Sequence, residues 1–197
     1  MTATNMPPKH RFLVLHDYGM GGLWWWIWAR SERELVERLA EVEVVGSPDA
    51  VARAETWNLD EVDIDADRLS AGLDDLRAKR EIQRSRPGFG ALAGRDLVHL
   101  REPWEDEHGV TIYLAEVGPD GRRLRQVEVA PDGTAVRSAP TDWVLNPPIV
   151  DLFDPEVVGK EIGREEFERA WRHARPETDP SMSRVHEPAH EKGARRP

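Results

Sequence analysis

The sequence contains no cysteine, which excludes disulfides, thiolate nucleophiles, iron–sulfur clusters and thiolate zinc sites. It also lacks long apolar runs, and residues 23–29 fall far short of the roughly 20 that a membrane-spanning helix needs. The first ten residues have no apolar segment like that of a secretory signal. These absences predict a soluble, cytoplasmic protein that does not bind membranes.

Acidic residues outnumber basic ones, and the formal net charge is −10 over 197 residues. Residues 31–70 hold twelve acidic and four basic residues, and residues 101–175 hold sixteen and ten. A negative field repels phosphate backbones and speeds the approach of basic proteins. The charge therefore disfavours nucleic acid and favours a basic protein partner, although the same acidity also serves simply to keep a protein in solution.

A β-hairpin is predicted near the N-terminus, because two apolar runs, residues 11–15 and 23–29, flank a glycine-rich segment. In the second run Trp24, Trp26 and Trp28 share one face of the strand. Trp25 and Ile27 share the other, because side chains alternate along a strand. Both faces are apolar, so we expect both to be covered.

Two helices are predicted to follow the hairpin. Ser31 begins a capping box and a helix over about residues 32–40, and residues 41–45 alternate as a third strand does. Leucines at helical spacing behind an acidic run predict a second helix over about residues 66–81. Glycine and proline in residues 84–94 mark the boundary between two halves.

The second half is predicted to be an antiparallel meander. Asp-Gly turns separate alternating runs, a strong short-range hairpin signal, and the strands are residues 97–100, 110–117, 122–129 and 134–137. Residues 139–155 are rich in proline and pack irregularly on the sheet. Apolar residues at helical spacing in residues 166–174 predict a closing helix.

The predicted fold class is therefore α+β, with an N-terminal β-hairpin plus helices and a C-terminal antiparallel meander packed by a C-terminal helix. The N-terminal unit spans residues 11–86 and the C-terminal unit spans residues 95–175. Residues 1–10 and 176–197 contain too few apolar groups to join a core and are predicted to be disordered.

A family resemblance covers about residues 97–175. It is carried by Tyr113-Leu114-Ala115-Glu116, an Asp-Gly turn, Arg125-Gln126-Val127-Glu128, Pro147-Pro148, and the segment from Ile162 through Phe167 to Trp171. This order resembles a small, uncharacterised bacterial domain that is often found beside polymorphic toxins and is considered immunity-like. The resemblance implies an immunity-like or antitoxin-like role. The usual short form of that family lacks the N-terminal 95 residues.

Two short motifs match the sequence patterns of metal-binding sites. Residues 186–190 read His-Glu-Pro-Ala-His, the H-E-x-x-H pattern of zinc peptidases, but Pro188 interrupts the helix that this chemistry needs. Asp63, Asp65 and Asp67 resemble the start of a calcium loop, whose sixth position is here Arg68 in place of glycine. We therefore predict no metal, no cofactor and no catalytic residue.

The predicted function is a non-enzymatic protein-binding module, with an immunity-like protein that neutralises a basic toxin as its most specific form. Tyr18 and Trp25 are candidate aromatic anchors, although a core position is the simpler interpretation of the tryptophans. The predicted acidic surface consists of Glu41, Glu43, Asp60, Glu61, Asp63 and Asp65. Two alternatives stay open. One is an enzyme or small-ligand binder that uses the glycine-rich loop 16–22 with His16 and Asp17, and the other is an accessory structural subunit.

Overall fold

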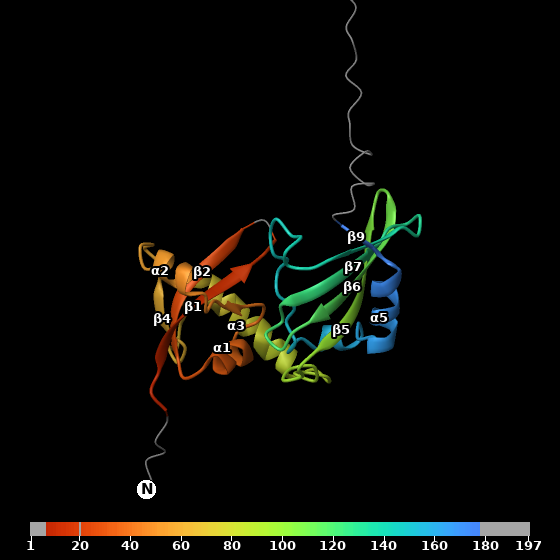
Figure 1. Cartoon of the computed structure of the whole chain (residues 1–197). Coiled ribbons are helices and arrows are strands. Elements are labelled where there is room, and N and C mark those ends of the chain that lie inside the picture. Colours follow the sequence, from red (N-terminus) through yellow and green to blue (C-terminus); the bar gives the residue numbers. More distant parts are fainter. Residues whose placement is uncertain (1–6, 20, 178–197) are drawn as a thin grey trace, which may run out of the picture.

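The computed structural model describes residues 7–19 and 21–177, and it has one β-sheet in each half of the chain (Figure 1). The N-terminal half contains β1 (His10–Asp17), β2 (Gly22–Ala29), α1 (Glu32–Arg38), β3 (Glu43–Val44), α2 (Pro48–Ala54), β4 (Glu61–Asp63) and α3 (Ala71–Arg84). The C-terminal half contains β5 (Val98–Asp106), β6 (Gly109–Val117), β7 (Arg123–Val129), β8 (Ala135–Ser138), α4 (Pro155–Val158), α5 (Arg164–His173) and β9 (Arg175–Pro176). The predicted α+β fold is confirmed.

The N-terminal sheet has the strand order β3-β1-β2-β4. β1 and β2 form the predicted hairpin, in which His10 pairs with Ala29 and Asp17 with Gly22. β4 joins β2 in parallel, which requires the long crossover that α1, β3 and α2 supply. Figure 1 shows α1 and α3 on one side of this sheet and α2 on the other.

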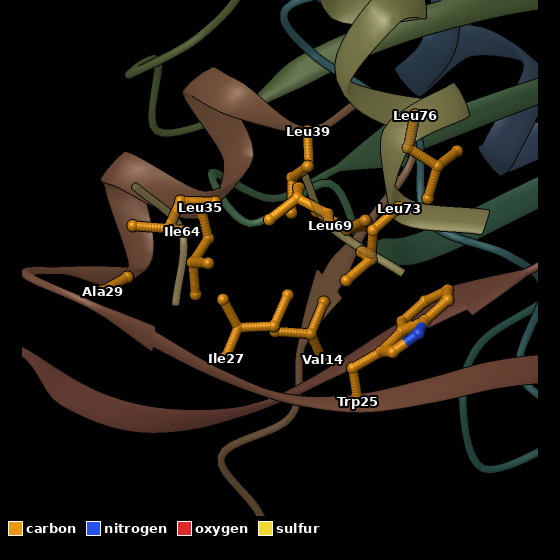
Figure 2. Close-up of a cluster of buried hydrophobic side chains, with 11 residues drawn as sticks. Val14, Trp25, Ile27, Ala29, Leu35, Leu39, Ile64, Leu69, Leu73 and Leu76 are labelled. Atoms are coloured by element: carbon orange, nitrogen blue, oxygen red, sulfur yellow. The ribbon is translucent and has the colours of Figure 1, made fainter. Parts of the chain in front are cut away.

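The larger core of this half lies between the sheet and the helices α1 and α3 (Figure 2). Trp25 and Ile27 point from β2 toward Leu35 of α1 and Leu73 of α3. On the other face Trp26 packs in a smaller cluster with residues of α2. The prediction that both faces of the tryptophan strand are covered is thus confirmed at Trp25, Trp26 and Ile27, whereas Trp28 is 38% exposed.

The C-terminal sheet is a meander with the order β5-β6-β7-β8-β9, in which β9 joins β8 in parallel. Helix α5 covers one face, where Phe167 packs against Leu114 and Val127. On the opposite face, Leu92 and Leu152 cover only the part of the sheet near the start of β5.

Several elements differ from the prediction. Residues 48–54 form a helix, because a proline at the first helical turn is already suited to begin one. α3 begins at Ala71, five residues after the predicted start, and β5 continues to Asp106. Of the residues expected to be disordered, His10 begins β1 and Pro176 is the second residue of β9.

Candidate functional site

The carboxylates predicted to make one acidic surface lie at opposite edges of the N-terminal sheet. Glu43 is on β3, whereas Glu61 and Asp63 are on β4, and β1 and β2 lie between those two strands. Glu41 precedes β3 and Asp65 follows β4. The predicted single surface is therefore wrong, because residues that are close in sequence are separated by the width of the sheet.

Most of these carboxylates also form ion pairs within the chain. Asp65 accepts hydrogen bonds from Arg30 at 2.6 Å and Arg38 at 2.5 Å, and it lies 2.7 Å from Lys9. Lys9 also pairs with Asp63. The hydrogen bond from Arg30, which has the largest effect, and those from Lys9 and Arg38 hold the pKa of Asp65 well below its ordinary value.

The other predicted carboxylates have partners too, which are Lys79 for Glu41 at 2.6 Å, Arg122 for Glu43, and Trp28 and Arg11 for Glu61 at 2.5 Å and 3.6 Å. Of the six predicted carboxylates, Asp60 alone forms no side-chain hydrogen bond or ion pair with another residue of 7–19 and 21–177. The negative charge of this region is thus largely neutralised by internal contacts, which corrects the expectation that it faces a partner.

The two predicted aromatic anchors have opposite environments. Trp25 is only 5% exposed and belongs to the core between the sheet and α3 (Figure 2), so its assignment as a surface anchor is wrong. Tyr18 is 58% exposed in the loop between β1 and β2, where its backbone N–H donates to the carbonyl oxygen of Gly21. Tyr18 therefore remains available for contact, whereas Trp25 does not.

The glycine-rich loop does not assemble an acid–base pair from the residues named for the enzyme alternative. His16 Nδ1 lies 2.9 Å from the carbonyl oxygen of Glu41, and the Asp17 carboxylate accepts the backbone N–H of Gly19 at 2.7 Å. Both side chains thus stabilise local backbone. Neither residue lines the cavity beside Arg80, the cavity beside Lys79 and Arg86, or the cavity between α5 and the sheet at Leu114.

A buried ion pair joins the two halves. Arg80 of α3 is 1% exposed and donates to Asp151 at 2.9 Å, as well as to the Leu39 carbonyl oxygen. The Asp151 carboxylate also accepts the backbone N–H groups of Glu41 and Phe153, each at 3.1 Å. This saturated arrangement connects α3, the start of β3 and the segment before α4, and it suits a structural role.

Two cavities of about 480 and 710 Å³ adjoin this junction, and Ile149, Val150 and Asp151 line both. The cations that line the larger cavity are mostly paired, with Lys79 bound to Glu41, Arg86 to Glu156 and Lys160 to Glu102. Three of the cations of the larger cavity are therefore already neutralised by carboxylates of the chain.

A buried polar cluster lies between α5 and the C-terminal sheet. Glu116 accepts two hydrogen bonds from Arg125, at 2.5 and 2.7 Å, and lies 3.1 Å from His99 Nε2. Arg125 also donates to Glu168 of α5 at 2.6 Å and covers the ring of Phe167. Mainly because of Arg125, the pKa of Glu116 lies below its ordinary value. The cluster stabilises the packing of α5 on the sheet. Its residues His99, Glu116 and Arg125 do not line these cavities.

A surface that the sequence analysis missed lies on the C-terminal sheet, on the face away from α5. Trp104 of β5 is 61% exposed there, and it lies opposite Thr111 of β6. Tyr113 of β6 lies opposite Glu128 of β7, which lies opposite Val136 of β8. We call these five residues the open face. In the sequence, Trp104 followed by three acidic residues could have indicated this surface, but the strand over residues 97–100 was predicted to end before Trp104.

Unpaired carboxylates surround the open face. Asp106 and Glu128 form no ion pair with a lysine or arginine in the described residues. Desolvation of the Tyr113 side chain, and after it the charges of Glu128 and Asp106, raise the pKa of Tyr113. Partial desolvation and the charge of Glu177 raise the pKa of Glu128. The region thus has uncompensated negative charge beside exposed aromatic surface.

The geometry defines a two-sheet α+β chain with a paired buried arginine and aspartate between its halves and an exposed aromatic and acidic surface on the second sheet. Among the described residues no cluster of three histidine, aspartate or glutamate side chains is placed to hold a metal ion. The His-Glu-Pro-Ala-His motif at 186–190 lies outside them. Within the same residues, every helix is too short or too polar to cross a bilayer. Comparison with protein-family models, curated proteins and solved structures found no match to this chain.

Proposed function

We propose that this chain is a non-catalytic protein-binding module whose partner is a basic protein. One observation carries the proposal, namely that the acidic residues near the tip of the β5–β6 hairpin form no ion pair with any lysine or arginine of residues 7–19 and 21–177. Glu105, Asp106 and Glu107 follow Trp104 there, and Asp132 occupies the neighbouring turn between β7 and β8. Glu41, Glu43, Asp63 and Asp65 of the N-terminal half differ, since each of them forms an ion pair with a lysine or arginine.

The placement of the hairpin supports this function. In Figure 1 the β5–β6 hairpin, drawn in green, projects away from the N-terminal half. Uncompensated charge at a projecting position attracts an oppositely charged protein over about a Debye length, roughly 10 Å at 0.1 M ionic strength. A basic partner would therefore meet this end of the molecule first.

An immunity-like or antitoxin-like role in a bacterial cytoplasm is the more specific form of the proposal. It is supported by the resemblance of residues 97–175 to the toxin-associated domain, because the acidic tip of the β5–β6 hairpin belongs to the same residues. The partner in that case is a basic toxin, which the module neutralises by covering the toxin surface.

Affinity capture at two ionic strengths tests the proposal. The immobilised chain is exposed to lysate at about 0.01 M salt, where the Debye length is about 30 Å, and washed at about 1 M, where it is about 3 Å. We expect a basic protein to be retained at low salt and released at high salt.

A pair of charge variants makes this experiment specific. Glu105→Lys/Glu107→Lys reverses the charge at the hairpin and should abolish capture of that protein. Asp60→Lys/Asp67→Lys makes the same change in net charge at exposed positions of the N-terminal half and should retain it. Equal capture by both variants, or recovery of acidic proteins only, would contradict the proposed function.

A further inference from the structure

The open face has the composition of a contact surface. Trp104 is the most exposed tryptophan in the described part of the chain, and Tyr113 and Val136 lie half-buried on the same face. Tryptophan and tyrosine supply large apolar area with few rotatable bonds and are enriched among the residues that dominate binding energies. On the other face of this sheet α5 covers the equivalent apolar positions.

The charged residues at the open face determine whether it attracts a positively or a negatively charged partner. Asp106 and Glu128 flank Tyr113 closely enough to affect its ionisation, and Glu177 adds a third carboxylate beside Glu128. Arg123 is the cation that also acts on Tyr113, and its own pKa is lowered by desolvation. Three carboxylates against one partly desolvated guanidinium favour a cationic ligand.

The edge of the sheet beside the open face is protected against strand addition. Along the first part of β5, Arg101 donates its backbone N–H to Lys160 at 2.8 Å, and Ile162 donates to His99 at 2.9 Å. Further along the strand stands Pro103, which has no N–H to offer to another strand. A partner therefore meets side chains of the open face and not the hydrogen-bonding groups of the strand edge.

We propose that the open face binds a basic, partly aliphatic segment of a protein partner, with Trp104 as its anchor. An arginine or lysine of that segment stacks on the indole ring of Trp104, within about 6 Å of its centre, as cation–π contacts require. Neighbouring cations pair with Asp106 and Glu128, and aliphatic groups cover Tyr113. This inference rests on the proposed function and gives it a location and a chemistry.

Nuclear magnetic resonance titration of the full chain tests the inference. The probe is a synthetic peptide of alternating arginine and valine, and a peptide of alternating glutamate and valine is its control. We expect the arginine peptide to shift the indole N–H signal of Trp104 and the backbone signals of Tyr113 and Glu128, with the N-terminal half unchanged. The glutamate peptide should cause no shift.

Variants separate the anchor from general charge. Trp104→Ala should weaken peptide binding about tenfold or more, as loss of a dominant interface aromatic does. Glu128→Gln should weaken it severalfold and reduce its dependence on salt. Trp57→Ala is the matched control, since Trp57 is 43% exposed in the N-terminal half, and should bind the peptide as the original chain does.

Several outcomes would overturn the inference. They are binding that Trp104→Ala leaves unchanged, shifts confined to the N-terminal half, absence of peptide binding, and self-association of the chain that Trp104→Ala abolishes. The last result would show that a second copy occupies the open face. Salt-sensitive capture of a basic protein that Trp104→Ala does not affect would leave the proposed function standing and refute only its location here.

Discussion

Loss of the carboxylate of Asp151 should destabilise the whole chain, because this group joins the two halves. It pairs with Arg80, which is 1% exposed, and accepts the backbone N–H groups of Glu41 and Phe153. Asp151→Ala removes all three interactions and leaves a buried guanidinium without its counterion. Breaking a buried ion pair from one side costs about 3–5 kcal/mol, so we expect a loss of that size in the free energy of unfolding.

Two comparisons define how much of this loss comes from charge. Asp151→Asn keeps an oxygen acceptor and should cost less than the alanine variant, about 1.5–3 kcal/mol, the usual range for a hydrogen bond to a charged group. Glu156→Gln removes the exposed partner of Arg86 and should change the free energy of unfolding very little, as exposed ion pairs contribute little.

Urea unfolding followed by tryptophan fluorescence provides the measurement, since tryptophans occur in both halves. Replacing both partners, as in Arg80→Met/Asp151→Leu, should recover part of the loss because no charge stays buried alone. If Asp151→Ala costs no more than Glu156→Gln, the reasoning is refuted and the junction carries little of the stability.

Two further changes test the assignments made in each half. Glu116→Gln should destabilise the chain by about 2 kcal/mol at neutral pH, because it removes the charge that Arg125 binds beside His99 and Glu168. The pKa of Glu116 is lowered by folding, so the stabilisation from its charge is complete above the ordinary pKa of 4.5 and is lost as the pH falls below that value. In urea titrations at several pH values, the difference in free energy of unfolding between the variant and the original chain should therefore shrink on acidification. A difference that does not depend on pH would contradict this. Trp25→Ala should cost about 3–5 kcal/mol and lower the melting temperature measured by circular dichroism, as removal of a buried aromatic does, whereas a small cost would contradict its place in the core.

Local patterns were sufficient for much of the fold. The alternation from Trp24 to Trp28 predicted a strand covered on both faces, and the capping box at Ser31 predicted α1, whose Glu34 N–H donates to the Ser31 hydroxyl. The Asp-Gly turns predicted the C-terminal meander. Each of these signals depends on neighbours along the chain, so a single sequence contains the information.

Contacts between residues that are distant in sequence could not be predicted from these local patterns. β4 is a three-residue strand whose place depends on Trp26 and Trp28, more than thirty positions earlier, and no periodicity in Glu61–Asp63 marks it. The ion pairs of Asp65 likewise depend on Lys9, Arg30 and Arg38. Counting charges along the sequence could not reveal that these acidic residues neutralise nearby cations.

The sequence by itself determined that this chain is acidic, free of cysteine and built from a hairpin, helices and a meander, because composition and periodicity are properties of the chain alone. Tertiary structure decided which charges remain unpaired and which aromatics stay exposed. It buried Trp25 and left Trp104 on the surface, although both are tryptophans in strands. Burial and charge pairing depend on what packs against a residue in space, and the sheet registers and helix placements that fix those neighbours arise only when the chain folds.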